Sequence, residues 1–416
     1  MEYWKKAAIV GALGAWSDTM DVFAALLVIG TAAVEWGIGP GLVGLAMTLS
    51  RAVAVPIYSA FSGIIIDLFG RKKLFSFGNF LAGIAYLGMA YSTDIWMWTA
   101  FSVPMIWSFF TTGAASIFVQ EELPAEKRGF YFGLTRMMTA IGALSISLSA
   151  PVFAALGWGW RPILLYNAIF DIFVGILGAT VLRESRVWLE RRELIKQGKI
   201  TKEERLPLRK VISDPFIRKR FFILSWVMFF LTFTRVPDWF RTTYQALTLG
   251  FDFSTIGYIA IAGTLMGLIS TPLFGRLSDI IGRVKVVIIS LIMCVVLSIL
   301  WFMTDILVGR GPVLPVILYF GSLISVWSLF FAAAGAFISL WQSELYPTSM
   351  RATLYTWNYL FYTPPDILLP SVAGSLGEQF GSIGYIAISS IGILAVIPVI
   401  IFHKELETKG VEITAN

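Results

Sequence analysis

Twelve long apolar runs, separated by short polar turns, constrain the fold of this chain more than any other feature. A helix needs about 20 mostly apolar residues to cross a bilayer, and twelve stretches of the 416-residue sequence meet that requirement. The sequence therefore predicts an all-α membrane protein with twelve transmembrane helices. The expected spans are residues 7–30, 41–62, 74–92, 96–121, 130–156, 161–182, 220–247, 254–275, 284–305, 312–343, 351–376 and 380–402.

Composition supports a chain whose outer surface meets lipid. Hydrophobic residues make up 57% of it and charged residues 14%, whereas soluble domains carry roughly 25% charged residues. The single cysteine, Cys294, and the single histidine, His403, argue against disulfides, a cysteine or histidine metal site and a Ser-His-Asp triad. A nucleotide-binding P-loop motif is also missing from the sequence. We expect no cofactor, no metal and no enzyme activity.

A polar turn motif, G-x-x-x-D-x-x-G-R, occurs twice, at Gly63–Lys73 and at Gly275–Lys285. Its glycines permit close backbone approach or positive φ, and its aspartate can cap a helix or meet an arginine. Because the copies follow corresponding spans, the sequence predicts two related halves. The expected parts are a six-helix bundle over residues 1–182, a cytoplasmic basic linker over 183–219, a second six-helix bundle over 220–402 and a cytoplasmic tail over 403–416.

The distribution of lysine and arginine predicts the orientation. With the N-terminus inside, 26 of the 32 basic residues fall on the cytoplasmic face, as the positive-inside rule requires. The net charge of +6 therefore reflects membrane topology, and we expect no nucleic-acid partner. Both termini are predicted to be cytoplasmic, in a monomer of the cell membrane. The linker has a helical stretch at Val187–Gln197 that we expect to lie near anionic lipid.

Further motifs identify a resemblance to the major facilitator superfamily, nearest to its sugar porters and their metabolite and organic-ion relatives. Besides the two turns, the chain has runs similar to the family's E-x-x-P-x-x-x-R-G turn, its P-E-S-P-R-W-L run, its turn after span ten and its P-E-T-K-G tail. These runs are Glu121–Gly129, Arg183–Leu189, Glu344–Arg351 and Glu407–Gly410. The resemblance implies two pseudo-symmetric bundles, a substrate site near the bilayer midplane and secondary active transport by alternating access.

Three departures from the sugar porters bear on the substrate. Arg136 stands where those proteins have a glutamine in span five, and the place of their span-four arginine is close to Phe101. Their glutamine-rich sugar-binding run in span seven is replaced by Thr232–Thr243. The resemblance therefore implies the fold of the sugar porters more strongly than it implies their specificity for sugars.

Asp18 and Asp21 are the candidate proton-coupling residues. Both fall near the middle of the first span, and their i, i+3 spacing places them on one helix face. Two nearby carboxylates out of water favour binding of a proton. Asp21 resembles the coupling aspartate of proton-driven sugar porters, and the D-x-x-D spacing resembles span one of aromatic-acid/proton symporters. The alternative is that both carboxylates pair with arginines and only hold helices together.

Charged and aromatic residues within the spans are the candidate substrate site. Arg51 and Arg136 are expected to face the cavity, where a guanidinium can clamp a carboxylate, or to partner the aspartates of span one. Arg235 and Asp238, beside the helix-breaking Pro237, are expected to form a gate or site, or to pair with each other while Arg241 reaches outward. Asp171 is expected to be structural. The expected substrate-binding residues are Arg51, Trp107, Arg136, Arg235, Asp238, Trp239, Trp357, Asn358, Tyr362 and Asp366.

The turn motifs are expected to act as latches that stabilise the outward-open state by tying cytoplasmic helix ends together. The sequence predicts a carrier that takes up a small polar organic solute with protons, and an organic acid anion is favoured. A sugar/proton symporter, an organic cation carrier and a transporter-like nutrient sensor are the alternatives. The expected latch residues are Gly63, Asp67, Gly70, Arg71, Glu121, Arg128, Asp279, Arg283, Glu344 and Arg351.

Overall fold

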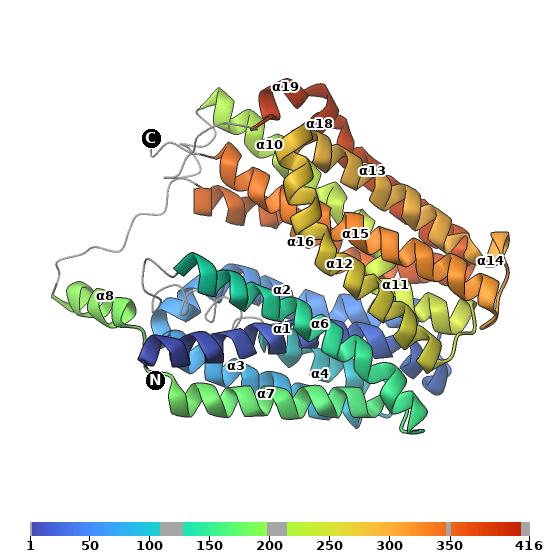
Figure 1. The fold of residues 1–416 in the computed structure, drawn as a ribbon, viewed down its shortest axis with the longest axis horizontal. Helices are drawn as coiled ribbons and strands as arrows, with labels where there is room; N and C mark the ends of the chain where they lie inside the picture. Colours follow the sequence, from blue (N-terminus) through green and yellow to red (C-terminus); the bar gives the residue numbers. More distant parts are fainter. Residues whose placement is uncertain (1, 109–127, 198–213, 347–350, 409–416) are drawn as a thin grey trace. The chain divides into compact units, whose positions relative to one another are not determined.

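Helices dominate the computed structural model, which describes residues 2–108, 128–197, 214–346 and 351–408 (Figure 1). No strand occurs within these ranges, so the predicted all-α fold is confirmed. The chain divides into two units. The first comprises Met1–Ile38, Ala46–Lys202 and Asp252–Tyr258, and the second comprises Gly39–Leu45, Glu203–Phe251 and Ile259–Asn416.

The first unit is built mainly from long helices that pack along one another. In it α3 lies along α7 and α4, and α1 lies along α6 and α7. The short helix α8 matches the helical stretch predicted for the linker to within one residue at each end. The bounds are α1 (Tyr3–Trp36), α2 (Pro40–Phe69, whose first residues belong to the second unit), α3 (Arg71–Ala90), α4 (Ile95–Ser108), α6 (Arg128–Ala155), α7 (Arg161–Val181) and α8 (Arg186–Lys196).

The second unit repeats the packing scheme of the first. Its α10 lies along α16, and α13 lies along α15 and α17. These pairs correspond to α1 with α6, α3 with α4 and α3 with α7, which is the pairing expected of two related bundles. The bounds are α10 (Pro215–Leu231), η2 (Thr232–Arg235), α11 (Val236–Thr243), η3 (Tyr244–Thr248), α12 (Phe253–Ile281), α13 (Arg283–Phe302), α14 (Thr304–Leu307), α15 (Leu314–Leu345), α16 (Arg351–Phe380), α17 (Ser382–Ile391), η4 (Gly392–Ala395), α18 (Val396–Ile401) and α19 (His403–Leu406).

Eight helices of the described ranges are long and apolar enough to cross a membrane by length and composition. The other four predicted spans correspond to α3, to α4 and the residues after it, to the broken run from α10 to η3, and to the proline-containing α16. The predicted break in span seven is present, because a 3-10 segment precedes Pro237 and a π-helical segment follows Thr243. Helix α16 runs through Pro364, Pro365 and Pro370.

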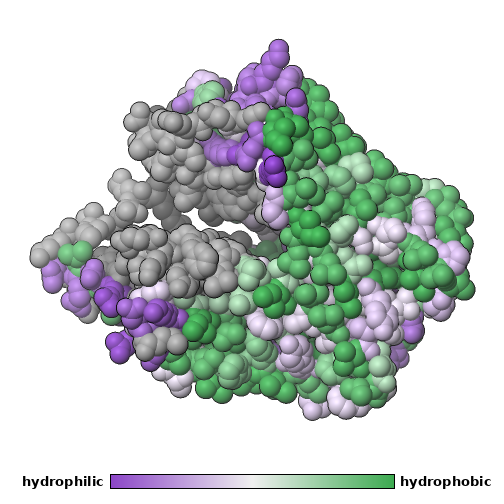
Figure 2. All heavy atoms as spheres, in the orientation of Figure 1, coloured by the Kyte–Doolittle hydropathy of each residue, from purple (hydrophilic) through white to green (hydrophobic). Residues whose placement is uncertain are grey.

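Large apolar side chains cover much of the outer surface, as expected for helices in lipid. Phe77 of α3 is 63% exposed, and Phe173 of α7 and Leu318 of α15 are also exposed. In Figure 2 hydrophobic residues cover wide parts of the visible face, and hydrophilic residues concentrate at α8 and around α19. The buried core of the second unit includes Leu224, Val287 and Leu291.

The two copies of the turn motif share one capping arrangement. Gly70, with φ +91°, precedes α3, and Gly282, with φ +103°, precedes α13. Glu184 accepts hydrogen bonds from the backbone amides of Arg71 at 2.8 Å and Lys72 at 3.1 Å. A carboxylate here satisfies amides that have no partner inside the helix and lies favourably in the helix dipole.

Glu407 does the same in the second unit. It accepts hydrogen bonds from the backbone amides of Arg283 at 2.8 Å and Val284 at 3.3 Å. A Cβ atom at Gly282 would clash with the Glu407 carboxylate. Both the positive φ and the lack of space therefore require glycine at this position.

We expect Gly282→Ala to lower the free energy of unfolding by about 1–3 kcal/mol, because it forces a side chain into a conformation that only glycine adopts readily. Gly275→Ala is the matched control from the same motif, since a Cβ there meets nothing within 4 Å. Thermal unfolding in detergent micelles measures both variants. Equal midpoints for the two variants would show that the turn does not depend on this glycine.

Candidate functional site

A cluster of buried polar side chains joins α1 to α7 in the first unit. Asp21 of α1 is 4% exposed, and Asn167 and Asp171 of α7 are fully buried. The Asn167 side-chain amide donates to Asp21 Oδ1 at 2.7 Å and to Asp171 Oδ2 at 3.3 Å. The two carboxyl groups therefore share one amide group, although their helices are far apart in the sequence.

Further hydroxyl groups hold this cluster in place. The Ser17 hydroxyl donates to Asp171, and its oxygen lies 3.1 Å from Asn79 Oδ1 of α3. The Tyr86 hydroxyl, also of α3, donates to the backbone carbonyl of Asp21. Helices α1, α3 and α7 are thus fixed to one another by hydrogen bonds inside an apolar bundle.

The structure distinguishes the two predicted proton-coupling residues. Asp18 is half-buried, whereas Asp21 is buried and turned toward α7. The sequence offered an arginine as the alternative partner of Asp21. Among the described residues Asp21 forms no ion pair, and the amide of Asn167 occupies that place. Asp171, which was expected to be structural, lies in the same cluster.

A second cluster surrounds Arg235 at the break in span seven. The Arg235 guanidinium pairs with Asp366 of α16 at 3.1 Å and with Asp238 of α11 at 3.3 Å. It also donates to the Tyr362 hydroxyl at 2.5 Å, and it lies 5.4 Å from the centre of the Trp239 ring. The structure thus brings five of the predicted site residues together, and the Arg235 charge is balanced by two carboxylates.

Two predicted binding residues of α16 belong to the packing of the second unit instead. Asn358 is fully buried; it accepts a hydrogen bond from Tyr346 at 2.6 Å and donates to Ser225 at 2.8 Å and to the Phe221 carbonyl at 3.2 Å. The Trp357 ring packs edge-on against Phe221. With its amide engaged on all sides, Asn358 holds α16 against α10 and offers little to a solute in this conformation.

The remaining predicted binding residues are Arg51, Trp107 and Arg136. The Arg51 guanidinium donates to the Met47 carbonyl of its own helix at 3.3 Å. The Trp107 indole nitrogen is buried, and within the described part of the chain it has no hydrogen-bond partner. Arg136 lies outside the residues whose side chains the structure describes.

Arg241 and Gln245 are site candidates that the sequence analysis did not select. Arg241 was expected to reach outward, but it is only 7% exposed, and it forms no hydrogen bond or ion pair with any described residue. Gln245 is 1% exposed, and within the described ranges neither polar atom of its side chain has a hydrogen-bond partner. Their i, i+4 spacing places both on one helix face. The sequence feature that could have identified Arg241 as a site residue is its position one turn after Asp238 in an apolar run.

The described latch residues form contacts within their own units. Arg283 pairs with Asp279 at 2.6 Å, and its Nε lies 3.6 Å from Glu344 of α15. Arg71 is buried beside the Glu184 cap. The motifs that contain Glu184 and Glu407 are recognisable in the sequence, but their capping role is not. The remaining latch residues lie outside the side chains that the structure describes, namely Gly63, Asp67, Glu121, Arg128 and Arg351.

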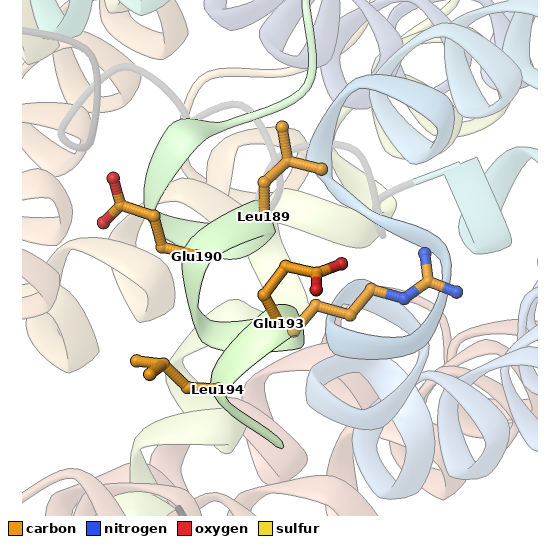
Figure 3. Close-up of a pocket in the computed structure, with 5 residues that line it drawn as sticks. Leu189, Glu190, Glu193 and Leu194 are labelled. Carbon is orange, nitrogen blue, oxygen red and sulfur yellow. The ribbon is translucent and has the colours of Figure 1, made fainter. Parts of the chain in front are cut away.

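A hollow of about 560 Å³ lies beside α8 (Figure 3). Its lining combines two leucines with three charged side chains, and every lining residue comes from this one short helix. No predicted binding residue is among them, so the hollow is not part of the candidate site. The lining consists of Leu189, Glu190, Arg192, Glu193 and Leu194.

Known proteins resemble this chain over most of its length. YhjE, an inner membrane metabolite transport protein of Escherichia coli (strain K12), is 25% identical over 272 residues, which are 63% of this chain and 58% of that protein. NiaP, a putative niacin/nicotinamide transporter of Bacillus subtilis (strain 168), is 26% identical over 417 residues and 98% of both chains. The inward-open structure of the xylose transporter XylE from E. coli superposes with a TM-score of 0.72 at 15% identity, covering 98% of this chain and 97% of that one.

The family model described as Major Facilitator Superfamily matches residues 11–363. The fold, with its two related six-helix bundles, is that of the solved transporter. The protein is a multi-pass membrane transporter of the secondary kind and not an enzyme. The chain belongs to the major facilitator superfamily.

Proposed function

We propose that this transporter carries a small organic acid anion across the cytoplasmic membrane together with a proton. The observation that carries the proposal is Arg241, a buried guanidinium with no counter-ion in contact among the described residues. Asp238, one turn before it, acts on Arg241 electrostatically but forms no ion pair with it. A buried charge without a direct partner is costly, and a solute carboxylate would supply that partner. A guanidinium binds a carboxylate through two parallel hydrogen bonds.

The neighbouring charges favour Arg241 over Arg235 for this role. Arg235 already pairs with Asp238 and Asp366, so a solute anion would have to displace a carboxylate from it. Gln245, one turn beyond Arg241, offers an amide N–H to the same carboxylate and an oxygen to a hydroxyl or N–H group of the solute. The preferred solute is therefore a carboxylate that carries a second polar group.

The full-length relative from Bacillus supports this class of solute. Its name gives niacin and nicotinamide as solutes, of which niacin is a carboxylic acid and nicotinamide its uncharged amide. The pair provides probes that differ in charge and little in shape. Sugars stay an alternative that the same measurements test.

The capped turns support a latch role in each unit. Glu184 and Glu407 fix the starts of α3 and α13 at the helix ends that we predict to be cytoplasmic. Arg283 connects its turn to Glu344 of α15. In the proposed cycle these contacts hold helix ends together in one conformation and separate in the other, and they carry no information about the solute.

We expect Arg241→Gln to weaken binding of nicotinate, or of the best ligand in a panel of organic acids, by roughly ten- to a hundredfold, because a charge-assisted hydrogen bond is lost. Ligand-dependent thermal stabilisation of the purified protein measures binding. Arg310→Gln, which removes a cation that is mostly exposed, is the matched control. Stabilisation by nicotinamide or D-xylose, with none by any carboxylate, would contradict the anion proposal.

We expect Asp21→Asn to abolish accumulation driven by a pH gradient, because an asparagine cannot release a proton. Proteoliposomes loaded at neutral pH and placed in acidic buffer with radiolabelled ligand measure accumulation, and exchange without a gradient should persist. Asp252→Asn at the exposed start of α12 is the control. Gradient-driven accumulation by the Asp21→Asn protein at the wild-type level would rule out Asp21 as the coupling group.

A further inference from the structure

Two buried carboxyl groups lie between α1 and α7, and no described cation contacts them to stabilise two negative charges. Asp21 and Asp171 are 4% and 0% exposed, and neither forms an ion pair with a described residue. The Asn167 amide donates to both. Two negative charges bridged by one neutral group and withdrawn from water repel each other strongly.

We propose that Asp171 is the second half of the proton site, and that Asp21 and Asp171 hold one exchangeable proton between them across Asn167. The inference rests on the proton coupling proposed above and names the site that performs it. Binding of one proton lowers the charge of the pair from two negative charges to one. Release of that proton restores the repulsion, which favours a change in how α1 packs on α7.

None of the described groups in contact with Asp21 and Asp171 carries a positive charge. On α1, Asp18 lies one turn before Asp21 and adds a further negative charge. On α3, Tyr86 donates to the Asp21 carbonyl and is neutral. Helix α4 and the part of α6 from Met137 to Ala155 contain no charged residue. No described residue of these elements places a positive charge in contact with the pair, and a bound proton would supply one.

The cluster also contains an unused acceptor. The side-chain oxygen of Asn167 is buried, and among the described residues it receives no hydrogen bond. Buried acceptors are normally satisfied, and a protonated carboxyl group would provide the missing donor. An asparagine at position 171 would fill a purely structural role without adding charge, so the second carboxylate argues for proton binding.

Burial separates this site from the solute. With Asp21 and Asp171 almost entirely enclosed, protons can reach them and an organic acid cannot in this conformation. The pair belongs to the first unit, whereas Arg241 belongs to the second. Proton binding can therefore be measured without any knowledge of the solute.

Infrared difference spectroscopy of the solute-free protein tests the pair through its protonated-carboxyl band. The wild type is expected to show one band that titrates with pH. In Asp171→Asn the band should titrate lower by about one pH unit or more, because coupled carboxyl groups interact by at least that amount. Asp21→Asn should shift it likewise, and Asp18→Asn should shift it less. An unchanged titration in Asp171→Asn, or an equal shift in Asp18→Asn, would overturn the inference.

A measurement on the wild-type protein covers the case in which the variants do not fold. Dicyclohexylcarbodiimide reacts with protonated carboxyl groups in apolar surroundings, and mass spectrometry locates the adduct. We expect adducts on Asp21 or Asp171 that exclude each other on one molecule and decrease as the pH rises. Molecules that carry both adducts, or adducts on neither residue, would contradict a shared proton. If the carboxyl band titrates as expected but a pH gradient does not drive transport, the shared-proton site is supported and the proposed proton symport is contradicted.

Discussion

A polar group buried in an apolar helix bundle needs a partner that the protein itself supplies, and this constraint determines where the chemistry of this transporter lies. Lipid offers no hydrogen bonds, so an unsatisfied group costs several kcal/mol. Asn358 meets the requirement with three side-chain hydrogen bonds to protein groups and is therefore a structural residue. Arg241 and the Asp21–Asp171 pair meet it incompletely, and for that reason they are candidates for binding what the transporter carries.

The same constraint explains the repeated capping of the turns. A helix that begins inside a tight turn exposes backbone amides, and a charged carboxylate from a distant segment is an efficient way to satisfy them. The chain uses it once in each unit, with Glu184 and with Glu407. Each carboxylate comes close to a glycine that has positive φ. Glycine and glutamate are thus required together, although more than a hundred residues separate them in the sequence.

Hydropathy predicted the helical architecture well because lipid requires long apolar helices, and that requirement is local in sequence. The break near Pro237 was predictable for the same reason, since proline acts on its own helix. The partners of the charges were not predictable. That Asp21 meets Asn167 and Asp366 meets Arg235 depends on which helix faces come together. A single sequence contains no record of those contacts. Asp366 was therefore expected at the substrate site and Arg241 was expected to reach outward, whereas the structure pairs Asp366 with Arg235 and buries Arg241.

The arrangement of charge gives a physical reason for coupling in the proposed cycle. In the ligand-free protein the Asp21–Asp171 pair has no contacting cation among the described residues, and Arg241 in the second unit has no contacting counter-ion among them. A proton reduces the first imbalance and a carboxylate reduces the second. Loading both adds no net charge to the protein, whereas loading either alone adds one charge to an apolar interior. Because desolvating a charge is costly, we expect the doubly loaded and empty forms to rearrange most easily, and cotransport of proton and anion is the proposal that this difference supports.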